Sequence, residues 1–198
     1  GLLVPIMALI AAYLSVAGER ESGSLKVLLG LPPSRGEVIA GKFLGRGVAV
    51  AGGIAAGFAI SGAVTAALYG RLPVAAFLAT TALTVLLAVS FLGIAVGISA
   101  VTATRARAMT LAITAYLGLT LLWDLAPNGV HLLVTGRLPG AGVPAWFLLV
   151  RGLSPTGAYN ALVQRTLLGD AGVAAATGGP APAFLSPVVF LAVMVAWA

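Results

Sequence analysis

The sequence predicts an all-α fold, a polytopic bundle of transmembrane helices, and composition is the first observation behind that prediction. Of the 198 residues, 60% are hydrophobic and only 8% are charged, and the mean hydropathy is +1.10. A soluble domain carries about 25% charged residues, so this chain could not cover a soluble core with a wettable surface. The second observation is the spacing of the charges, which leaves uncharged stretches close to the ~20 residues that a membrane crossing needs. These stretches are residues 1–18, 47–70, 72–104, 108–123 and 171–198.

We expect about five crossings in this chain. They run over residues 1–17, 47–69, 74–101 and 108–122, and a fifth begins near residue 181. None of these runs alternates apolar and polar residues as barrel strands do. The chain has no initiator methionine, and both of its ends fall inside apolar runs. We therefore expect an internal fragment of a longer protein, with residues 1–198 forming a single transmembrane domain.

The densest polar segment, residues 19–46, lies between the first two predicted spans. It holds three of the five acidic residues and five of the eleven basic ones. Residues 24–29 are predicted to form a short helix that the proline pair Pro32-Pro33 must end. Ser34 and Glu37 have the spacing of a capping box, in which the serine caps a helix and the glutamate bonds back to it. We therefore predict a second helix that starts at Ser34 and continues directly into the second span.

The segment 126–180 differs from the spans because it mixes glycine, proline and scattered polar residues with short apolar pieces. Residues 145–150 and 158–168 are apolar but too short to cross a bilayer comfortably. In the second piece, polar residues turn away from an apolar face at helical spacing, as in an interfacial or re-entrant helix.

Small residues predict where helices pack closely. Gly53 and Gly57 form one G-x-x-x-G pair in the second span, and Gly93 and Gly97 form another in the third. Small side chains let helix backbones approach each other in lipid. We expect these four glycines to lie at helix–helix contacts.

The basic residues predict the orientation. If the spans alternate, seven basic residues lie on the side of the 19–46 loop and four lie on the other side. The first group is Arg20, Lys26, Arg35, Lys42, Arg46, Arg105 and Arg107, and the second is Arg71, Arg137, Arg151 and Arg165. Positive charge accumulates on the cytoplasmic side, so we expect the 19–46 loop in the cytoplasm and the 126–180 segment outside. The net charge of +6 then reflects membrane topology and not a nucleic-acid partner.

The chain offers little for catalysis. Gly36 to Lys42 fits G-x-x-x-x-G-K, but Phe43 follows where a P-loop needs serine or threonine, and no strand precedes it. There is one histidine, His131, and no cysteine. The predicted spans carry no ionisable residue at mid-membrane, where ion-coupled carriers usually place one. We expect no catalytic residue, no metal site and no cofactor in this chain.

The loop resembles a known family. Residues 21–29, ESGSLKVLL, are followed by Pro32-Pro-Ser-Arg35 and Gly41-Lys42-Phe-Leu44. This pattern is similar to the E-x-G-[TS]-x-x-x-L-L-x-x-P-x-S-R…G-K motif of ABC-2 type permeases, whose fold is also described as type V exporter-like. It resembles most the branch that includes the permease of the nitrous-oxide-reductase accessory system. Ser24 replaces the commoner threonine, and the proline is doubled.

The resemblance implies six spans in a multi-pass cell-membrane protein, with the 19–46 loop carrying a coupling helix between the second and third. It implies an ATP-binding subunit as partner, a second permease subunit as homo- or heterodimer, and ATP hydrolysis on the separate subunit. The residues assigned to docking are Glu21, Ser22, Gly23, Ser24, Leu25, Leu28, Leu29, Arg35 and Lys42. The apolar face of the short helix could instead lie on the protein's own helices or on lipid headgroups.

Two functions remain open from the sequence. The first is a permease subunit of an ATP-driven transporter, moving an unidentified substrate. The second is a non-transporting membrane component, such as an assembly scaffold or a membrane-embedded enzyme. Substrate and transport direction are not encoded in any motif found here.

Overall fold

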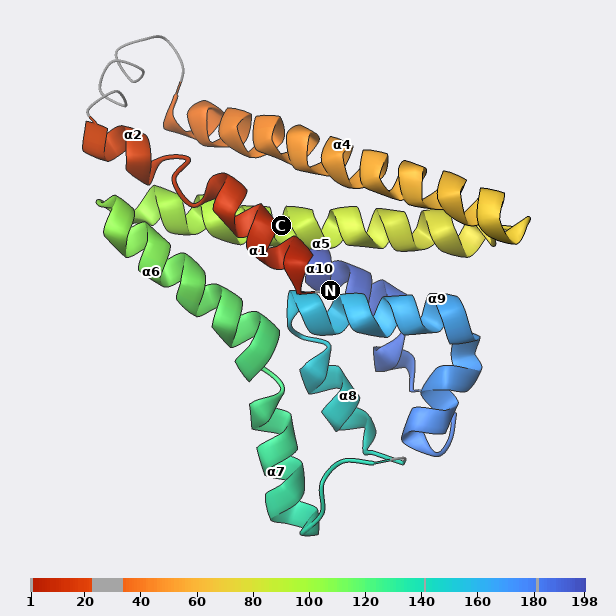
Figure 1. The fold of residues 1–198 in the computed structure, drawn as a ribbon. Helices are drawn as coiled ribbons and strands as arrows, with labels where there is room; N and C mark the ends of the chain where they lie inside the picture. Colours follow the sequence, from red (N-terminus) through yellow and green to blue (C-terminus); the bar gives the residue numbers. More distant parts are fainter. Residues whose placement is uncertain (1, 23–33, 141, 181) are drawn as a thin grey trace.

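The computed structural model describes residues 2–22, 34–140, 142–180 and 182–198, and every regular element within these ranges is a helix (Figure 1). This confirms the predicted all-α class. In chain order the helices are α1 (Leu3–Ala12), α2 (Ala17–Ser22), α4 (Arg35–Tyr69), α5 (Val74–Val101), α6 (Arg105–Tyr116), the π-helix η1 (Leu117–Leu122), α7 (Leu125–Thr135), α8 (Ala145–Arg151), α9 (Pro155–Thr177), the 3-10 helix η2 (Ala183–Leu185) and α10 (Pro187–Ala196).

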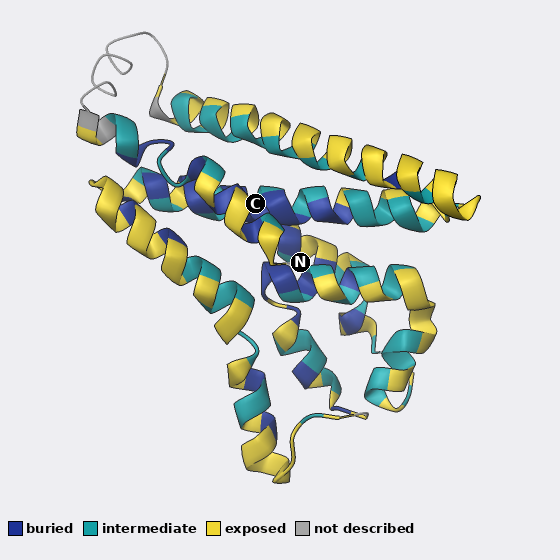
Figure 2. Ribbon diagram, in the orientation of Figure 1, coloured by how far each residue is buried: buried dark blue, intermediate teal, exposed yellow. Residues whose placement is uncertain are grey.

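Helix α5 lies at the centre of the bundle and contacts α1, α4, α9 and α10. It is apolar all round, as expected for a helix surrounded by others. Leu87, Phe91 and Leu92 of α5 are fully buried. Buried side chains from α1, α9 and α10 join them, so the core forms around α5 and not between the outer helices (Figure 2).

Three of the described helical runs are long and apolar enough to cross a membrane: Gly36–Tyr69, Val74–Val101 and Arg105–Thr135. Leu3–Glu19 and Pro187–Ala196 are apolar but shorter. The outer helix α4 leaves many large apolar side chains exposed along its length, among them Leu44, Val48, Ile60, Val64 and Leu68. An apolar surface this long is stable in lipid and not in water. The chain is a helical membrane protein.

The predicted helix start at Ser34 is confirmed. The Ser34 hydroxyl accepts a hydrogen bond from the backbone N–H of Glu37 at 3.3 Å, and the Glu37 carboxylate accepts one from the N–H of Ser34 at 2.6 Å. The two bonds satisfy helix N–H groups that have no intrahelical partner. From this cap α4 continues without a break for 35 residues. The last part of the loop, from Arg35 onward, and the second span are therefore one continuous helix.

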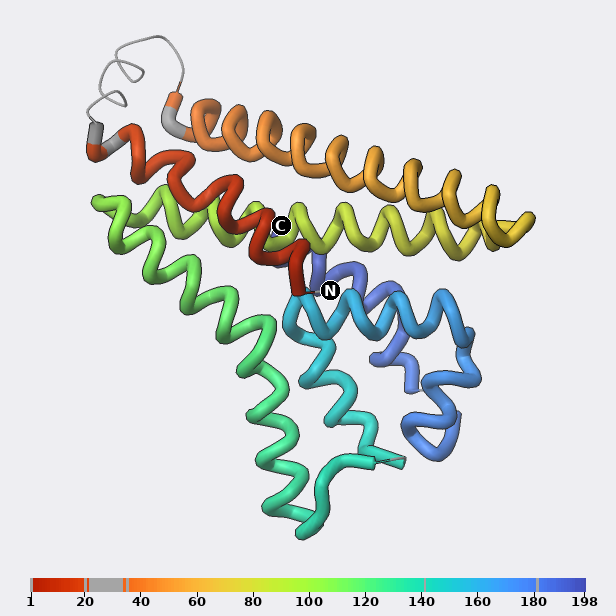
Figure 3. Tube along the Cα trace, viewed as in Figure 1, coloured from red at the N-terminus to blue at the C-terminus, as the bar shows by residue number. Residues whose placement is uncertain are grey.

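The fourth predicted span extends further than expected. Residues 105–135 form one run, in which α6 passes into the π-helix η1 and then into α7. The run diverges from α5 along its length (Figure 3). Pro127, in the segment that was set apart from the spans by its composition, falls in the first turn of α7, where proline disturbs no helical hydrogen bond.

The two short apolar pieces of the 126–180 segment correspond to α8 and to the first part of α9. The kink in α9 lies at Gly169, whose φ of 64° suits glycine. Before the kink, α9 packs against α5 and α10 and places Ala158 and Leu162 in the core. The apolar face therefore packs on the protein at Tyr159, Leu162 and Val163, whereas Leu167 is exposed.

Candidate functional site

The loop predicted to meet a partner is described only at its two ends. Gly23, Ser24, Leu25, Leu28 and Leu29 lie outside the described residues. Ser22 is the last residue of α2, which also carries Glu21. Arg35 and Lys42 lie near the start of α4. The structure thus shows how the base of the loop is held, and α2 is the element that three other helices contact there.

The start of α2 is fixed by α5. The backbone N–H groups of Val16 and Ala17 both donate to the hydroxyl of Ser99, at 2.9 and 3.0 Å. Ser99 is completely buried. The first N–H groups of a helix have no partner within it, and here a side chain from the end of α5 supplies the acceptor. This contact could not be predicted from the sequence, because Ser99 lies in an apolar span 83 residues away from Val16.

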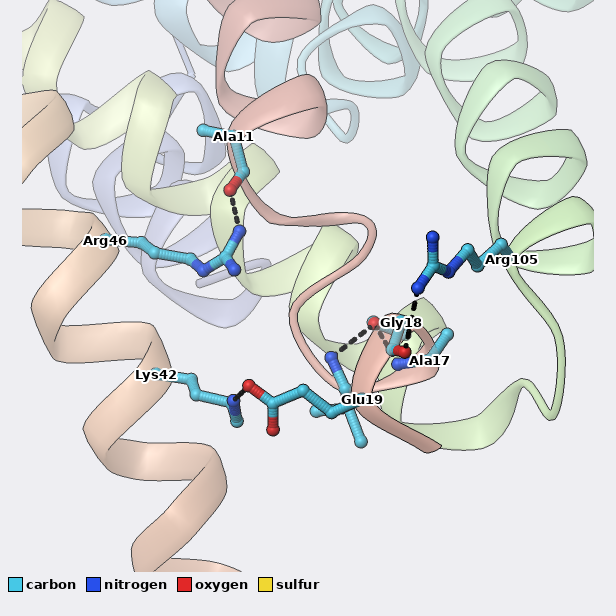
Figure 4. Close-up of polar contacts among 9 residues, drawn as sticks. Ala11, Ala17, Gly18, Glu19, Lys42, Arg46 and Arg105 are labelled. Carbon is cyan, nitrogen blue, oxygen red and sulfur yellow. Dashed lines mark hydrogen bonds and ion pairs between the residues drawn. The ribbon is translucent and has the colours of Figure 1, made fainter. Parts of the chain in front are cut away.

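Two basic residues of α4 connect α4 to α1 and α2 (Figure 4). The Lys42 ammonium forms an ion pair with the Glu19 carboxylate at 2.5 Å. One turn further along α4, the Arg46 guanidinium donates to the backbone carbonyl of Ala11 in the last turn of α1. Residues four apart lie on the same helix face, so Lys42 and Arg46 present two cations to one side of the loop base.

The third connection joins α2 to α6. The Glu21 carboxylate accepts a hydrogen bond from the backbone N–H of Arg105 at 2.7 Å, and the Arg105 guanidinium donates to the carbonyl of Gly18 at 3.4 Å. Arg105 is the first residue of α6. A carboxylate is favoured at a helix N-terminus because it accepts from free N–H groups and faces the positive end of the helix dipole.

We call the set Glu19, Glu21, Lys42, Ser99 and Arg105 the α2 clamp. It joins α2 to α4, α5 and α6 at the same end of the bundle (Figure 1). Two of its members, Glu21 and Lys42, were assigned from the sequence to partner docking. The structure places both in contacts within the chain. Ser99 and Arg105 were not assigned, because their contacts depend on residues more than 80 positions away.

The four predicted packing glycines differ in their surroundings. A Cβ at Gly93 would collide with the backbone of Ala198, so two backbones approach closely there. A Cβ at Gly53, Gly57 or Gly97 meets nothing within 4 Å. Gly53 and Gly57 border a groove of about 550 Å³ between α1 and α4. Close helix packing at Gly53, Gly57 and Gly97 stays a prediction, because only lipid or another chain could fill the space beside them.

We predict that Ser99→Ala destabilises the protein. The variant leaves the N–H groups of Val16 and Ala17 without their acceptor, and one buried unpaired polar group costs about 1–3 kcal/mol. Thermal unfolding of the purified protein measures the effect. Ser61→Ala, an exposed serine on α4, is the matched control and is expected to unfold at the wild-type temperature. Equal unfolding temperatures for the two variants would show that Ser99 does not hold α2.

A bundle of apolar helices, with its loop base fixed to three of them, defines a polytopic integral membrane protein. The family model for "ABC-2 family transporter protein" matches residues 1–198, and the chain belongs to this family. It is 33% identical over 185 residues to the "Probable ABC transporter permease protein NosY" of Pseudomonas aeruginosa, covering 91% of this chain and 64% of that protein. It is 31% identical over 162 residues to the protein of the same name from Stutzerimonas stutzeri, covering 80% of this chain and 57% of that protein. The chain therefore spans about three fifths of the length of these relatives.

Proposed function

We propose that this chain is part of the permease subunit of an ATP-driven ABC transporter. The observation that carries the proposal is the match of the ABC-2 transporter family along the whole chain. In this proposal ATP is hydrolysed on a separate ATP-binding subunit, and a second permease subunit, identical or related, completes the membrane part. The substrate is unidentified.

The loop between α2 and α4 is the proposed contact with the ATP-binding subunit. In the helix predicted from the sequence, Leu25, Leu28 and Leu29 would form an apolar face, which an aqueous loop has little reason to expose unless a partner covers it. An apolar helix face that fits a groove on a partner is a common mode of recognition. Ser22 to Ser24 and Arg35 flank this face and would contribute the polar contacts at its rim.

The α2 clamp supports this proposal because it offers a route for motion. The loop continues on one side into α4, which is one unbroken helix from Arg35 to Tyr69. On the other side it continues into α2, which is bonded to α5 through Ser99 and to α6 through Glu21. A displacement of the loop by a partner would therefore act on three membrane helices together. We assign Glu21 and Lys42 to positioning the loop.

The orientation of the loop tests the proposal, because an ATP-binding subunit is cytoplasmic. The chain has no cysteine, so single cysteines can be introduced without background. Gly36 and Gly140 are suitable because a Cβ at either meets nothing within 4 Å. In intact cells, Gly36→Cys is expected to be protected from a membrane-impermeant thiol reagent, whereas Gly140→Cys is expected to react.

Permeabilised cells are the control, in which both cysteines should react. The opposite pattern in intact cells, with position 36 labelled and position 140 protected, would place the loop outside. An external loop cannot meet a cytoplasmic ATPase, and the proposal would then be wrong.

A further inference from the structure

A second polar region lies away from the loop, beside η1, which follows α6 in the chain. It is a cavity of about 170 Å³ between η1, α8, both parts of the kinked helix α9, η2 and α10. Nothing in the transport proposal uses it. Its walls are unusually polar for a membrane protein of which 60% of residues are hydrophobic.

Two threonine hydroxyls in this wall have no hydrogen-bond partner among the described residues. Thr156 is only 8% exposed, and its Oγ1 is buried without a partner. The Oγ1 of Thr120, on the π-helix η1, is also buried without a hydrogen-bond partner. Buried polar atoms are nearly always paired with protein or bound solvent, and π-helical turns are frequent at functional sites. Both threonines line the cavity.

Helix α9 presents a polar stripe to the cavity. Thr156, Asn160 and Gln164 follow one another at intervals of four residues, which places them on one face, and all three line the cavity. Thr156 is the second residue of α9, directly after the Ser154 cap and Pro155. At this end of α9, Pro155 has no N–H and the Gly157 N–H donates to the Ser154 hydroxyl at 3.0 Å. The end therefore offers an anion the Thr156 N–H and the partial positive charge of the helix N-terminus.

The side-chain charges of the wall are also positive on balance. Arg151 and Arg165 line the cavity together with one carboxylate, Asp124. Arg151 holds Asp124 through two hydrogen bonds, Nε at 3.2 Å and Nη2 at 2.8 Å, so these two charges offset each other. Arg165 pairs instead with Asp170 at 2.5 Å, and the Asp170 side chain is 80% exposed.

The pair is exposed on its Asp170 side, whereas the Arg165 side chain is 20% exposed. Solvent screens the Asp170 carboxylate, so an anion in the cavity could compete with Asp170 for Arg165. The guanidinium of Arg165 is held in place by its hydrogen bond from Nη1 to the Leu185 carbonyl, at 2.9 Å. The arrangement therefore combines a fixed cation, a helix N-terminus, two unpaired hydroxyls and two side-chain amides around a small volume. Sites for drug-sized molecules are larger, about 300–1,000 Å³.

We propose that this cavity binds a small oxyanion, an inorganic anion of the size of sulfate or phosphate. The anion's oxygens would accept from Thr156, Thr120 and the α9 N-terminus, and its charge would lie against Arg165. The proposal goes beyond the permease function and is independent of whether the loop binds an ATPase.

Thermal unfolding of the full-length protein in detergent, titrated separately with sulfate and with phosphate, tests the site. Chloride at matched ionic strength is the control, because sulfate and phosphate at high concentration stabilise proteins without binding to a site. A ligand that binds the folded state raises the unfolding temperature in a saturable way at millimolar concentration. We expect such a response for at least one of the two anions and none for chloride.

Variants separate a bound anion from bound water. Thr156→Val keeps the shape of the side chain and removes the hydroxyl, and Arg165→Gln removes the charge. Each is expected to weaken anion affinity about tenfold or more, as for the loss of one hydrogen bond to a charged group. Arg71→Gln, an exposed arginine between α4 and α5, should respond to the anions as the wild type does.

Thr156→Val in the absence of anion should unfold at or above the wild-type temperature, because it removes an unpaired buried hydroxyl. This readout shows that the variant folds and that a lost response is a loss of binding. A wild-type protein without a saturable response, or variants that respond as strongly as wild type, would overturn the proposal and leave water as the occupant.

Discussion

Leu28→Asp and Leu29→Asp are each expected to remove the ATP-binding subunit from the purified permease while the permease still reaches the membrane. Burial of one leucine contributes about 1.5–3 kcal/mol, and each Asp variant loses that contribution. It also places a carboxylate in an apolar contact, at a further desolvation cost. A loss of 3 kcal/mol alone corresponds to roughly a 100-fold weaker complex. The measurement is the ratio of the two subunits after affinity purification through a tagged permease.

Lys26→Ala is the control in the same loop. An exposed ion pair contributes about 0–1 kcal/mol, so this variant should retain most of the ATP-binding subunit. The prediction rests on the sequence pattern of the loop, because positions 26, 28 and 29 lie outside the described residues. Full retention of the subunit and full transport in both Asp variants would show that residues 24–29 are not the coupling element.

Reversal of one charge in the α2 clamp is expected to destabilise the loop base, and reversal of both is expected to restore it. Glu19→Lys or Lys42→Glu alone brings like charges together where the ion pair now measures 2.5 Å. The Lys42 side chain is only 16% exposed, so solvent screens the repulsion weakly. The cost should exceed the ~1 kcal/mol of an exposed pair and stay below the ~3–5 kcal/mol for breaking a fully buried one.

The double variant Glu19→Lys, Lys42→Glu tests whether the effect belongs to the pair. A double-mutant cycle on unfolding free energies isolates the interaction between two residues in contact. We expect the double variant to unfold closer to the wild type than either single variant does. Additive losses in the double variant would mean that the two residues do not act together, and the link between α2 and α4 would lose its support.

Features carried by local sequence could be predicted. The capping box at Ser34 and Glu37 involves residues three apart, and the structure has both of its hydrogen bonds. The helical class followed from composition and from the length of the apolar runs. The motif around residues 21–44 indicated the ABC-2 family, and the family match over the whole chain confirmed it.

Features that depend on distant residues could not be predicted. Ser99 reads as one small residue of an apolar span, and only the packing of α1 against α5 shows that it caps α2. From the sequence, Asn160 and Gln164 were expected on the outer, polar face of an interfacial helix. The neighbours that turn this face into a cavity wall, η1 and α8, come from other parts of the chain. Helix periodicity predicts which face of a helix a residue lies on, but it does not predict which element packs against that face.

Helix ends in the 105–180 region were also hard to place. The fourth span was expected to end at residue 122, just before Trp123 and Asp124, yet the helical run continues to Thr135. The two residues still mark a junction, because the Trp123 indole donates to the Val150 carbonyl at 2.9 Å and Asp124 holds Arg151. Both bonds attach α8 to the end of η1, a tertiary role that the local sequence does not encode.

Site-specific photo-cross-linking in native membranes tests the central claim, that the loop contacts a separate ATP-binding subunit. A photoreactive residue is placed at Ser24 in the full-length protein, and a second variant carries it at Gly140 as the control. Mass spectrometry then identifies the cross-linked partners. We predict an adduct between position 24 and an ATP-binding protein, and none with that protein from position 140. If position 24 yields adducts only with lipid or with the permease itself, the loop does not contact an ATPase.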